Sequence, residues 1–431
     1  MVLDTNATTV HRSSEHEIRD SEQTTCCVVG GGPAGMILAY LLARQQVPVI
    51  LLEAHKDFDR DFRGDTIHPS VMENLDELGL AERLLQLRHT KIRNIALPTG
   101  NGSATPIDFS PLKIKYPYVT LMPQSEFLDF MAAEAQRLPH FKLIMGGRVE
   151  ELIDEGGVVR GVRYQSGDGW HEIRATLTVG ADGRFSRLRR LSGLEAITTS
   201  PPMDVLWFRL PRLATEPEGA MARVKPGRLM AMLDRREQWQ IAYVIPKDSF
   251  RELKEAGIQA LRQSIVELAP ELADRVDGLQ DWKQVALLSV AADRLRQWYK
   301  PGLLLIGDAA HTMSPVGGVG INYAIQDAVA TANILTAPLQ TGRLRLSDLR
   351  AVQRRRELPT RFIQTIQSII QQRVISSLLD SRAQPKLPGL VLWLVQFRFV
   401  RSIPARVMGI GLRPEHVQQR HEIATTAPRP A

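Results

Sequence analysis

The fold follows from one stretch of the sequence, Val28-Val29-Gly30-Gly31-Gly32-Pro33-Ala34-Gly35. It continues an apolar run that starts at Cys26, and its glycines at 30, 32 and 35 have the G-x-G-x-x-G spacing. The first glycine permits a tight turn, the second lets backbone approach a pyrophosphate, and the third lets a helix pack on the strand. We therefore predict a buried strand and then a helix from Met36 to Arg44, whose N-terminus attracts phosphate.

A second predicted strand, Val47 to Leu52, ends at Glu53 and Ala54. A carboxylate at that end is placed to accept hydrogen bonds from a ribose hydroxyl, and it disfavours a 2′-phosphate. Strand, helix, second strand and terminal acid together predict a dinucleotide site, with FAD or NAD favoured over NADP. The alternative is a glycine-rich turn in an ordinary βαβ unit.

Two later segments point in the same direction. The apolar run Leu177 to Val179 ends in Gly180-Ala181-Asp182-Gly183, although Asp-Gly after a strand is usually only a turn. Leu303 to Ile306 is another predicted buried strand, and it ends in Gly307-Asp308. The glycine-rich stretch from Pro315 to Asn322 then opens a helix, and such backbone is an anion site. A reduced isoalloxazine fits that site; the alternative is a structural loop with a solvated Asp308.

The three segments, in this order, resemble the signature of the para-hydroxybenzoate hydroxylase class of FAD-dependent aromatic monooxygenases, which includes the ubiquinone-biosynthesis hydroxylases. The likeness extends over roughly residues 24–416. It implies FAD as cofactor and NADPH or NADH as reductant. It also implies that O2 forms a flavin C4a-hydroperoxide, which hydroxylates an aromatic or lipophilic small molecule.

The resemblance also implies roles for individual residues. In that family, the acid matching Glu53 holds the adenosine ribose, and the aspartate matching Asp308 holds the ribityl or pyrophosphate region. The motif around Asp182 lies near the FAD pyrophosphate and the path of the pyridine nucleotide. The cofactor-binding set implied by the resemblance is Gly30, Gly32, Pro33, Ala34, Gly35, Glu53, Ala54, Arg63, Gln124, Val149, Asp182, Asp308, Pro315, Gly318, Val319, Gly320, Ile321 and Asn322.

The expected fold class is α/β: a Rossmann-like FAD-binding domain with a β-meander, a smaller β-sheet substrate domain, and C-terminal helices. Glycine pairs at 156–157 and the Gly167-Asp168-Gly169 turn punctuate the predicted meander. The predicted division is a disordered tail over 1–24, the FAD-binding domain over 25–200 and 301–345, the substrate domain over 201–300, and a C-terminal helical region over 346–431.

Predicted strands of the substrate domain are Met203 to Leu210, Arg228 to Leu233 and Trp239 to Ile245, and the last two form a hairpin. A small-molecule pocket between this sheet and the flavin is expected. Side-chain alternation decides which residues face the pocket, and the sequence leaves that register open, so each candidate can instead be core. The candidate lining residues are Trp207, Met230, Met232, Trp239 and Tyr243.

The C-terminal part is predicted to be helical from Leu346 to Leu379 with an interruption at Pro359, and the Arg354-Arg355-Arg356 run is interpreted as a solvated basic turn. Residues 387–412 are apolar with interspersed arginines. Such a segment can make a peripheral membrane contact, cover the substrate domain or form a dimer contact.

Composition excludes several classes of protein. The net charge of +7 is spread along the 431 residues without a recognition motif, which argues against a nucleic-acid partner. The two cysteines, Cys26 and Cys27, are adjacent on a predicted buried strand, which suits a reducing, cytoplasmic location. No metal-ligand spacing or catalytic triad is apparent, and no catalytic residue is assigned. His68 is interpreted as a satisfied structural histidine, and His311 as structural or flavin-adjacent.

Other functions on the same architecture stay open. A flavin-dependent halogenase would carry a tryptophan-x-tryptophan motif near Ile241 to Pro246, where this chain has Ile-Ala-Tyr-Val-Ile-Pro. An epoxidase or a prenyl reductase would suit a lipophilic substrate. A prenyl-binding protein that does not use flavin is disfavoured, because Asp308 and the glycine-rich loop are present.

Overall fold

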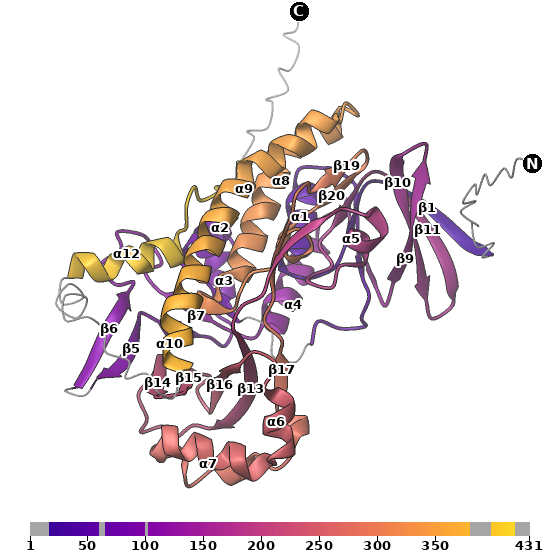
Figure 1. Cartoon of the computed structure of the whole chain (residues 1–431). Helices are drawn as coiled ribbons and strands as arrows, with labels where there is room; N and C mark the ends of the chain where they lie inside the picture. The colour runs from indigo at the N-terminus through magenta and orange to yellow at the C-terminus, as the bar shows by residue number, and fades with distance from the viewer. Residues whose placement is uncertain (1–16, 60–64, 100–101, 380–397, 419–431) are drawn as a thin grey trace, which may run out of the picture.

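Two main sheets and the helices that cover them build the molecule (Figure 1). The computed structural model describes residues 17–59, 65–99, 102–379 and 398–418. One main sheet is largely parallel and carries the glycine segments, and the other is mixed. The α/β fold class is therefore confirmed.

The first sheet has the strand order β19-β20-β11-β1-β2-β8. The strands from β20 to β8 are parallel, and β19 pairs antiparallel with β20 at the edge. Strand β2 is buried at every position, as expected for a parallel strand that is covered on both faces. The bounds are β1 Ile18–Val29, β2 Val49–Glu53, β8 Phe141–Met145, β11 Gly169–Gly180, β19 Tyr299–Lys300 and β20 Leu303–Leu305.

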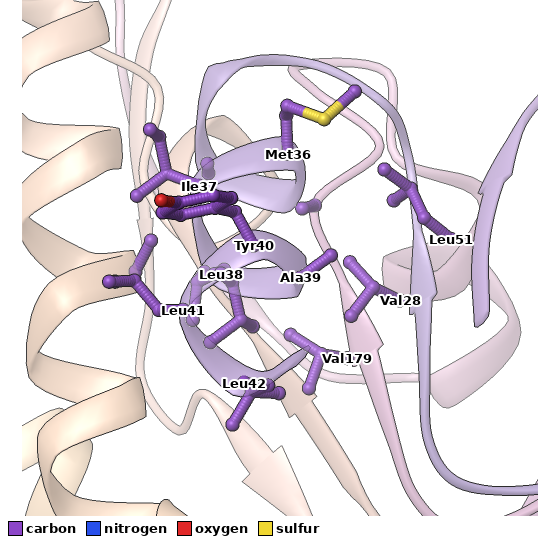
Figure 2. Close-up of a cluster of buried hydrophobic side chains, with 14 of the residues drawn as sticks. Val28, Met36, Ile37, Leu38, Ala39, Tyr40, Leu41, Leu42, Leu51 and Val179 are labelled. Atoms are coloured by element: carbon purple, nitrogen blue, oxygen red, sulfur yellow. The ribbon is translucent and has the colours of Figure 1, made fainter. Parts of the chain in front are cut away.

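Helix α1, Pro33–Arg44, lies at the centre of the main core. Proline at the first helical position suits the helix start, since its missing amide would have no partner there. Figure 2 shows side chains of α1 packed with Val28, Leu51 and Val179 from three neighbouring strands. Helix α4, Gln124–Ala135, and helix α8, Gly320–Gln340, also contact α1. The helix that follows the glycine turn is thus held rigidly on the sheet.

The predicted β-meander is present. Strands β9 Arg148–Glu155 and β10 Val158–Ser166 run antiparallel to each other, and β10 pairs antiparallel with β11. The glycines at 156 and 157 form the first turn with φ of +63° and +81°. Helix α5, Arg187–Ser192, follows β11. The chain then passes to the second sheet through strand β12, Ala196–Thr199, and returns from it through strand β18, Ala292–Leu295. These two strands pair with each other in antiparallel orientation.

The second main sheet has the order β17-β13-β16-β15-β14-β5-β6. All three strands predicted for it are confirmed, as is the hairpin between β15 and β16. Strands β5 and β6 belong to this sheet through the pairing of β5 with β14, although they lie within the segment expected to belong to the FAD-binding domain. The bounds are β5 Asn94–Thr99, β6 Gly102–Asp108, β13 Met203–Pro211, β14 Ala220–Lys225, β15 Arg228–Asp234, β16 Gln238–Pro246 and β17 Ala286–Leu288.

Smaller elements complete the described chain. Helices α6 Phe250–Glu255 and α7 Ile258–Leu268 are separated by Gly257, which has φ +88°. A small sheet has the order β3-β7-β4. The remaining bounds are β3 Thr66–Ile67, α2 Pro69–Glu77, α3 Ala81–Leu84, β4 Thr90–Ile92, β7 Val119–Leu121, and the short helices η1 Pro270–Leu272, η2 Val276–Gly278, η3 Trp282–Gln284, η4 Gly307–Ala309 and η5 Val316–Gly318.

The C-terminal helices differ from the prediction in two ways. Helix α9, Leu346–Ile369, continues through the buried Pro359, so the predicted interruption is wrong. Proline removes one hydrogen bond, and the adjoining turns keep the helix continuous into the π-helical turn η6, Ile370–Ile375, and α10, Ser376–Leu379. Arg356 is 1% exposed, so the interpretation of the arginine run as a solvated turn is also wrong for that residue.

Two further expectations concern the ends of the chain. The tail predicted over 1–24 is too long, because β1 begins at Ile18 and pairs with β11 from there; residues 1–16 lie outside the described residues. Helix α12, Arg398–Gly409, lies beside β6 (Figure 1) and buries Ala405 completely. Within the described ranges, no helix combines the length and the apolar character needed to cross a bilayer.

Candidate functional site

The carboxyl ends of neighbouring parallel strands bring the three glycine segments together. The Gly30 amide donates to the Leu52 carbonyl over 2.7 Å, and the Ala181 amide donates to the Val29 carbonyl over 2.7 Å. Strand β20, which leads to Gly307, pairs with β11 on its other side. Segments far apart in the chain therefore border one edge of the sheet, where open α/β sheets bind their nucleotides.

The first glycine turn contains an open cradle. Gly30 has φ +104°, and a Cβ there would lie 2.5 Å from the Ala181 carbonyl oxygen. A Cβ on Gly35 would lie 2.0 Å from the Gly30 carbonyl oxygen. Gly32 is the N-cap of α1, and a Cβ built on it would have no atom within 4 Å, apart from those of the two adjacent residues. The first turn of the helix, which begins with Pro33 and Ala34, holds no acidic residue, so the cradle fits a pyrophosphate.

Glu53 ends β2 at the rim of this cradle and is 8% exposed. Its Oε2 accepts from the Gly31 amide over 2.9 Å, and its Oε1 accepts from the His55 amide over 3.0 Å. These bonds fix the carboxylate beside the exposed Ala54. Because a carboxylate oxygen accepts more than one hydrogen bond, Glu53 fits the predicted contact with a ribose.

The side chain of Asp182 caps a helix. Its Oδ1 accepts from Ser186 Oγ over 2.5 Å, and its Oδ2 accepts from the amides of Arg187 and Leu188 over 2.6 and 3.1 Å. Burial raises the pKa of this carboxyl despite those hydrogen bonds. The backbone of Asp182, by contrast, lies against the cradle, since its Cα is 2.7 Å from the Cβ position of Gly30. We therefore expect Asp182 to shape the site through its backbone and not through its carboxylate.

The third segment presents Asp308 on a short helical turn after β20. Gly307 has φ +58°, which favours glycine, and Asp308 is half-buried. The glycine-rich loop that follows is fastened to a distant strand: Thr66 Oγ1 donates to the Gly318 carbonyl over 2.9 Å, and Asn322 Nδ2 donates to the Thr66 carbonyl over 3.3 Å. The carboxamide of Asn322 is thus committed to the protein, and the loop backbone is the part that fits a flavin ring.

The other predicted cofactor residues are placed as follows. Gln124 begins α4, and its amide donates to Asp65 Oδ1 over 3.3 Å. Val149 is 4% exposed in β9, so only its backbone suits an adenine contact. Arg63 lies outside the described residues. Pro315, Val319, Gly320 and Ile321 lie in the loop and first turn of α8, and their cofactor contacts stay predictions.

The two faces of the second sheet separate the five predicted lining residues. Four of them pack into the core between this sheet and α7, away from the glycine-rich loop: Met230, Met232, Trp239 and Tyr243. Their predicted place in the pocket lining is wrong. The side chain of Trp207 lies on the opposite face, in the cluster that also contains Val316 from the loop.

One row of residues crosses four strands on that opposite face and consists of Trp207 and three alanines; we call this row the lane. Trp207 on β13 is opposite Ala242 on β16, Ala242 is opposite Ala231 on β15, and Ala231 is opposite Ala222 on β14. Neighbouring strands are about 4.8 Å apart, so the four strands span about 14 Å. The indole Nε1 of Trp207 is buried and has no hydrogen-bond partner among the described residues. The lane is therefore a row of apolar side chains, small at its three alanines, with one hydrogen-bond donor at its end.

Sequence reasoning missed the contact that joins this sheet to the cofactor segments. Asp65 forms an ion pair with Arg235, and its Oδ2 accepts from Gln240 Nε2 over 2.9 Å. Through Oδ1 it also caps α4 at Gln124. A lone acid in a loop gives no sequence signal for such a role, because Gln240 is 175 residues away.

The interpretation of His68 as a satisfied structural histidine agrees with the structure. The residue is 1% exposed, and its Nδ1 lies 2.7 Å from the Met408 carbonyl oxygen. Burial lowers the pKa of His68 to about 4, against a smaller opposing effect of that hydrogen bond. His68 is therefore neutral at pH 7 and is held by α12.

The fold and the site define a flavoprotein of the aromatic hydroxylase type. The sequence matches the family described as FAD binding domain over residues 23–365. It is 35% identical over 376 residues to a 6-methylpretetramide 4-monooxygenase of Streptomyces rimosus, covering 86% of this chain and 90% of that protein. The chain belongs to this family and is an FAD-dependent monooxygenase.

Solved structures agree on the fold. PqsL of Pseudomonas aeruginosa in complex with 2-aminobenzoylacetate has a TM-score of 0.71 at 20% identity, covering 84% of this chain and 98% of that one. The p-nitrophenol 4-monooxygenase PnpA of Pseudomonas putida DLL-E4 has a TM-score of 0.70 at 21% identity, covering 90% of this chain and 94% of that one. At these identities the likeness concerns the fold alone.

Proposed function

We propose that this monooxygenase hydroxylates a flat phenolic compound of several fused rings, with NADPH or NADH as reductant and O2 as the source of the oxygen atom. The observation that carries the proposal is the lane from Trp207 to Ala222 beside the glycine-rich loop. Three alanines in register present little side-chain bulk, which would suit an extended flat molecule. The 35% identical relative, named for a 4-monooxygenase acting on 6-methylpretetramide, supports this choice.

Each part of the chain has a role in this proposal. The cradle at Gly32 holds the FAD pyrophosphate, Glu53 holds the adenosine ribose, and the loop from Pro315 to Asn322 lies against the flavin ring. Bound FAD supplies the redox chemistry, by the oxygen-activation route that the resemblance implies. The apolar lane orients the substrate and excludes water, and the exclusion of water limits side reactions at the flavin that consume reductant without hydroxylating the substrate.

The Trp207 indole supplies an orienting contact in the same proposal. A buried N–H without a partner gains a hydrogen bond when a substrate oxygen occupies the end of the lane. A phenol or quinone oxygen at the edge of a fused ring system suits this donor. The catalytic step itself needs no assigned base from the protein, and none is proposed.

Alternative reactions on this architecture are less well supported. Halogenation is disfavoured, because Ile241 to Pro246 lacks both tryptophans of the halogenase pattern. Epoxidation or reduction of a prenyl chain would suit a narrow tunnel, whereas the lane extends across four neighbouring strands. A cytoplasmic location remains part of the proposal.

The membrane contact expected of residues 387–412 remains a proposal for part of that segment only. Residues 387–397 lie outside the described residues, and α12 uses one side to pack against β6. Ile403 is 48% exposed and Arg406 is exposed, so an apolar and a basic side chain are available at the surface.

The experiment compares substrates of increasing ring number with the purified holoenzyme. Stimulated oxidation of NADH and NADPH is measured together with incorporation of labelled oxygen from O2 into the product. The proposal expects tight coupling with three- or four-ring phenols and weak stimulation by one-ring phenols. Efficient hydroxylation of one-ring phenols alone, or product without oxygen from O2, would contradict it.

A further inference from the structure

The turn that carries Asp308 is held from behind by a buried carboxylate. Asp327, on α8, is fully buried, and its Oδ2 accepts from the Gly307 amide over 3.0 Å. The same oxygen lies 2.6 Å from His311 Nε2. These two contacts stand on either side of Asp308 in the chain, so the position of the turn depends on Asp327.

Arg356 balances this carboxylate. Its side chain is 2% exposed, and its Nε donates to Asp327 Oδ1 over 2.9 Å. Burial alone would raise the pKa of Asp327, but His311 and Arg356 together lower it below its ordinary value. An unpaired charge at this depth is strongly destabilising. His311 and Arg356 together therefore keep Asp327 ionised behind the turn.

Arg356 is held in turn by the C-terminal segment. Its Nη1 lies 3.4 Å from Glu415 Oε1, and Glu415 is 5% exposed. Two hydrogen bonds hold the backbone of Glu415 in place. Its N–H donates to Gln326 Oε1, and its carbonyl oxygen accepts from Asn74 Nδ2 over 2.7 Å. The chain of contacts thus runs from the C-terminal segment through Glu415, Arg356 and Asp327 to the turn.

The same segment also touches the glycine-rich loop. A Cβ built on Gly317 would lie 3.1 Å from the sulfur of Met408 in α12. The carbonyl of Met408 bonds to His68, whose amide donates to Asn322 Oδ1 over 2.8 Å. Residues 398–418 therefore contact the glycine-rich loop directly and reach the turn that carries Asp308 through Arg356 and Asp327.

We propose that Glu415 is a positioning residue for FAD, which acts through Arg356 and Asp327 on the turn that presents Asp308. The C-terminal segment 398–418 is then a clasp that retains the flavin half of the cofactor. This inference rests on the proposed contact between Asp308 and FAD. It explains why three charged side chains, Asp327, Arg356 and Glu415, are buried in contact with one another behind this turn.

The test is a double-mutant cycle in the full chain between Glu415→Gln and Asp308→Asn. Glutamine keeps the size of the side chain and removes its charge. The dissociation constant and the dissociation rate of FAD are measured by flavin fluorescence, and the reduction potential of bound flavin is measured in parallel. Glu255→Gln is the matched control, because Glu255 pairs with Arg251 on the surface of α6, outside the clasp, with 66% and 89% side-chain exposure.

We expect Glu415→Gln to weaken FAD binding about tenfold and to shift the flavin potential, while Glu255→Gln leaves both unchanged. In the cycle, Glu415→Gln should add little to Asp308→Asn, because both act on one contact. Additive effects, or an unchanged dissociation constant in Glu415→Gln, would overturn the inference.

Two further results separate this inference from the proposed function. If Asp308→Asn itself leaves FAD binding intact, the proposed cofactor placement fails; if only Glu415→Gln is silent, the clasp alone fails. Should Glu415→Gln not yield folded protein, Arg356→Lys replaces it, since lysine keeps the charge and loses the planar fork. The same tenfold loss and the same non-additivity are expected, and their absence would count equally against the clasp.

Discussion

Replacing Gly32 with alanine adds one methyl group where the proposed pyrophosphate meets the backbone. Gly32 has an ordinary φ of −69°, and no atom beyond its chain neighbours lies within 4 Å of its Cβ position. The protein without FAD should therefore accept alanine without strain. Because alanine restricts the unfolded chain, the free energy of unfolding should rise by about 0.5 kcal/mol.

FAD binding should respond in the opposite direction. A methyl group in the cradle pushes the pyrophosphate away from the amides at the start of α1. A hydrogen bond to a charged group contributes about 1.5–3 kcal/mol. Loss of one such bond corresponds to a rise of roughly 10- to 100-fold in the dissociation constant of FAD.

The assay removes FAD and titrates it back onto the wild type and each variant, with chemical denaturation of the FAD-free protein alongside. Gly167→Ala is the matched control, because this hairpin glycine also has no atom within 4 Å of its Cβ position and lies in the meander. Wild-type FAD affinity in the Gly32→Ala protein would refute the cradle, as would an equal loss in the control.

Further predictions concern the lane, the two aspartates and one buried histidine. Ala231→Leu should lower kcat/KM for a multi-ring phenol roughly 10- to 100-fold by overfilling the lane, with FAD affinity unchanged; steady-state kinetics with FAD titration checks both. Asp308→Ala should leave purified protein with strongly reduced flavin content, measured by its visible absorbance. Asp182→Asn should retain flavin and lose about 1 kcal/mol of unfolding free energy, since it weakens the cap of α5; loss of flavin with unchanged stability would contradict this. Because the pKa of His68 is about 4 in the folded protein against 6.5 ordinarily, only the unfolded chain takes up its proton between those pH values. Unfolding free energy should therefore fall by about 3 kcal/mol as pH drops from 6.5 to 4, and denaturation of His68→Gln should show a shallower decline.

The parallel sheet and its glycine turns could be predicted because their signals are local. An apolar run, a glycine spacing and a terminal acid lie within about 30 residues of each other, the length of one βαβ unit. Gly30 and Gly35 are required by close backbone approaches that the spacing itself encodes. The three separate segments then meet because parallel strands end at one edge of the sheet.

The register of the substrate sheet could not be predicted, for a physical reason. From Trp239 to Ile245, β16 is buried at every position, since α7 covers one face and the loop side covers the other. Alternation of polar and apolar residues is therefore absent, and Trp239 looks no different from Ala242. That three alanines on adjacent strands lie side by side can be seen only once the pairing of the strands is known.

The burial of Arg356 could not be predicted, because of the arginines next to it and because its partners are far away in the sequence. Arg354 and Arg355 are exposed, and a run of three arginines is usually solvated. Its partners, Asp327 and Glu415, are 29 and 59 residues away in the chain. Likewise, β5 reveals its sheet only through its pairing with β14. Contacts of this kind leave no local pattern in a single sequence.

The most direct measurement is a crystal structure of the purified protein saturated with FAD. We expect density for the adenosine at Glu53, the pyrophosphate over Gly32, and the flavin ring between the loop from Pro315 to Asn322 and the lane from Trp207 to Ala222. A colourless protein that rejects added FAD, or a flavin bound away from the ends of β2, β1, β11 and β20, would contradict it.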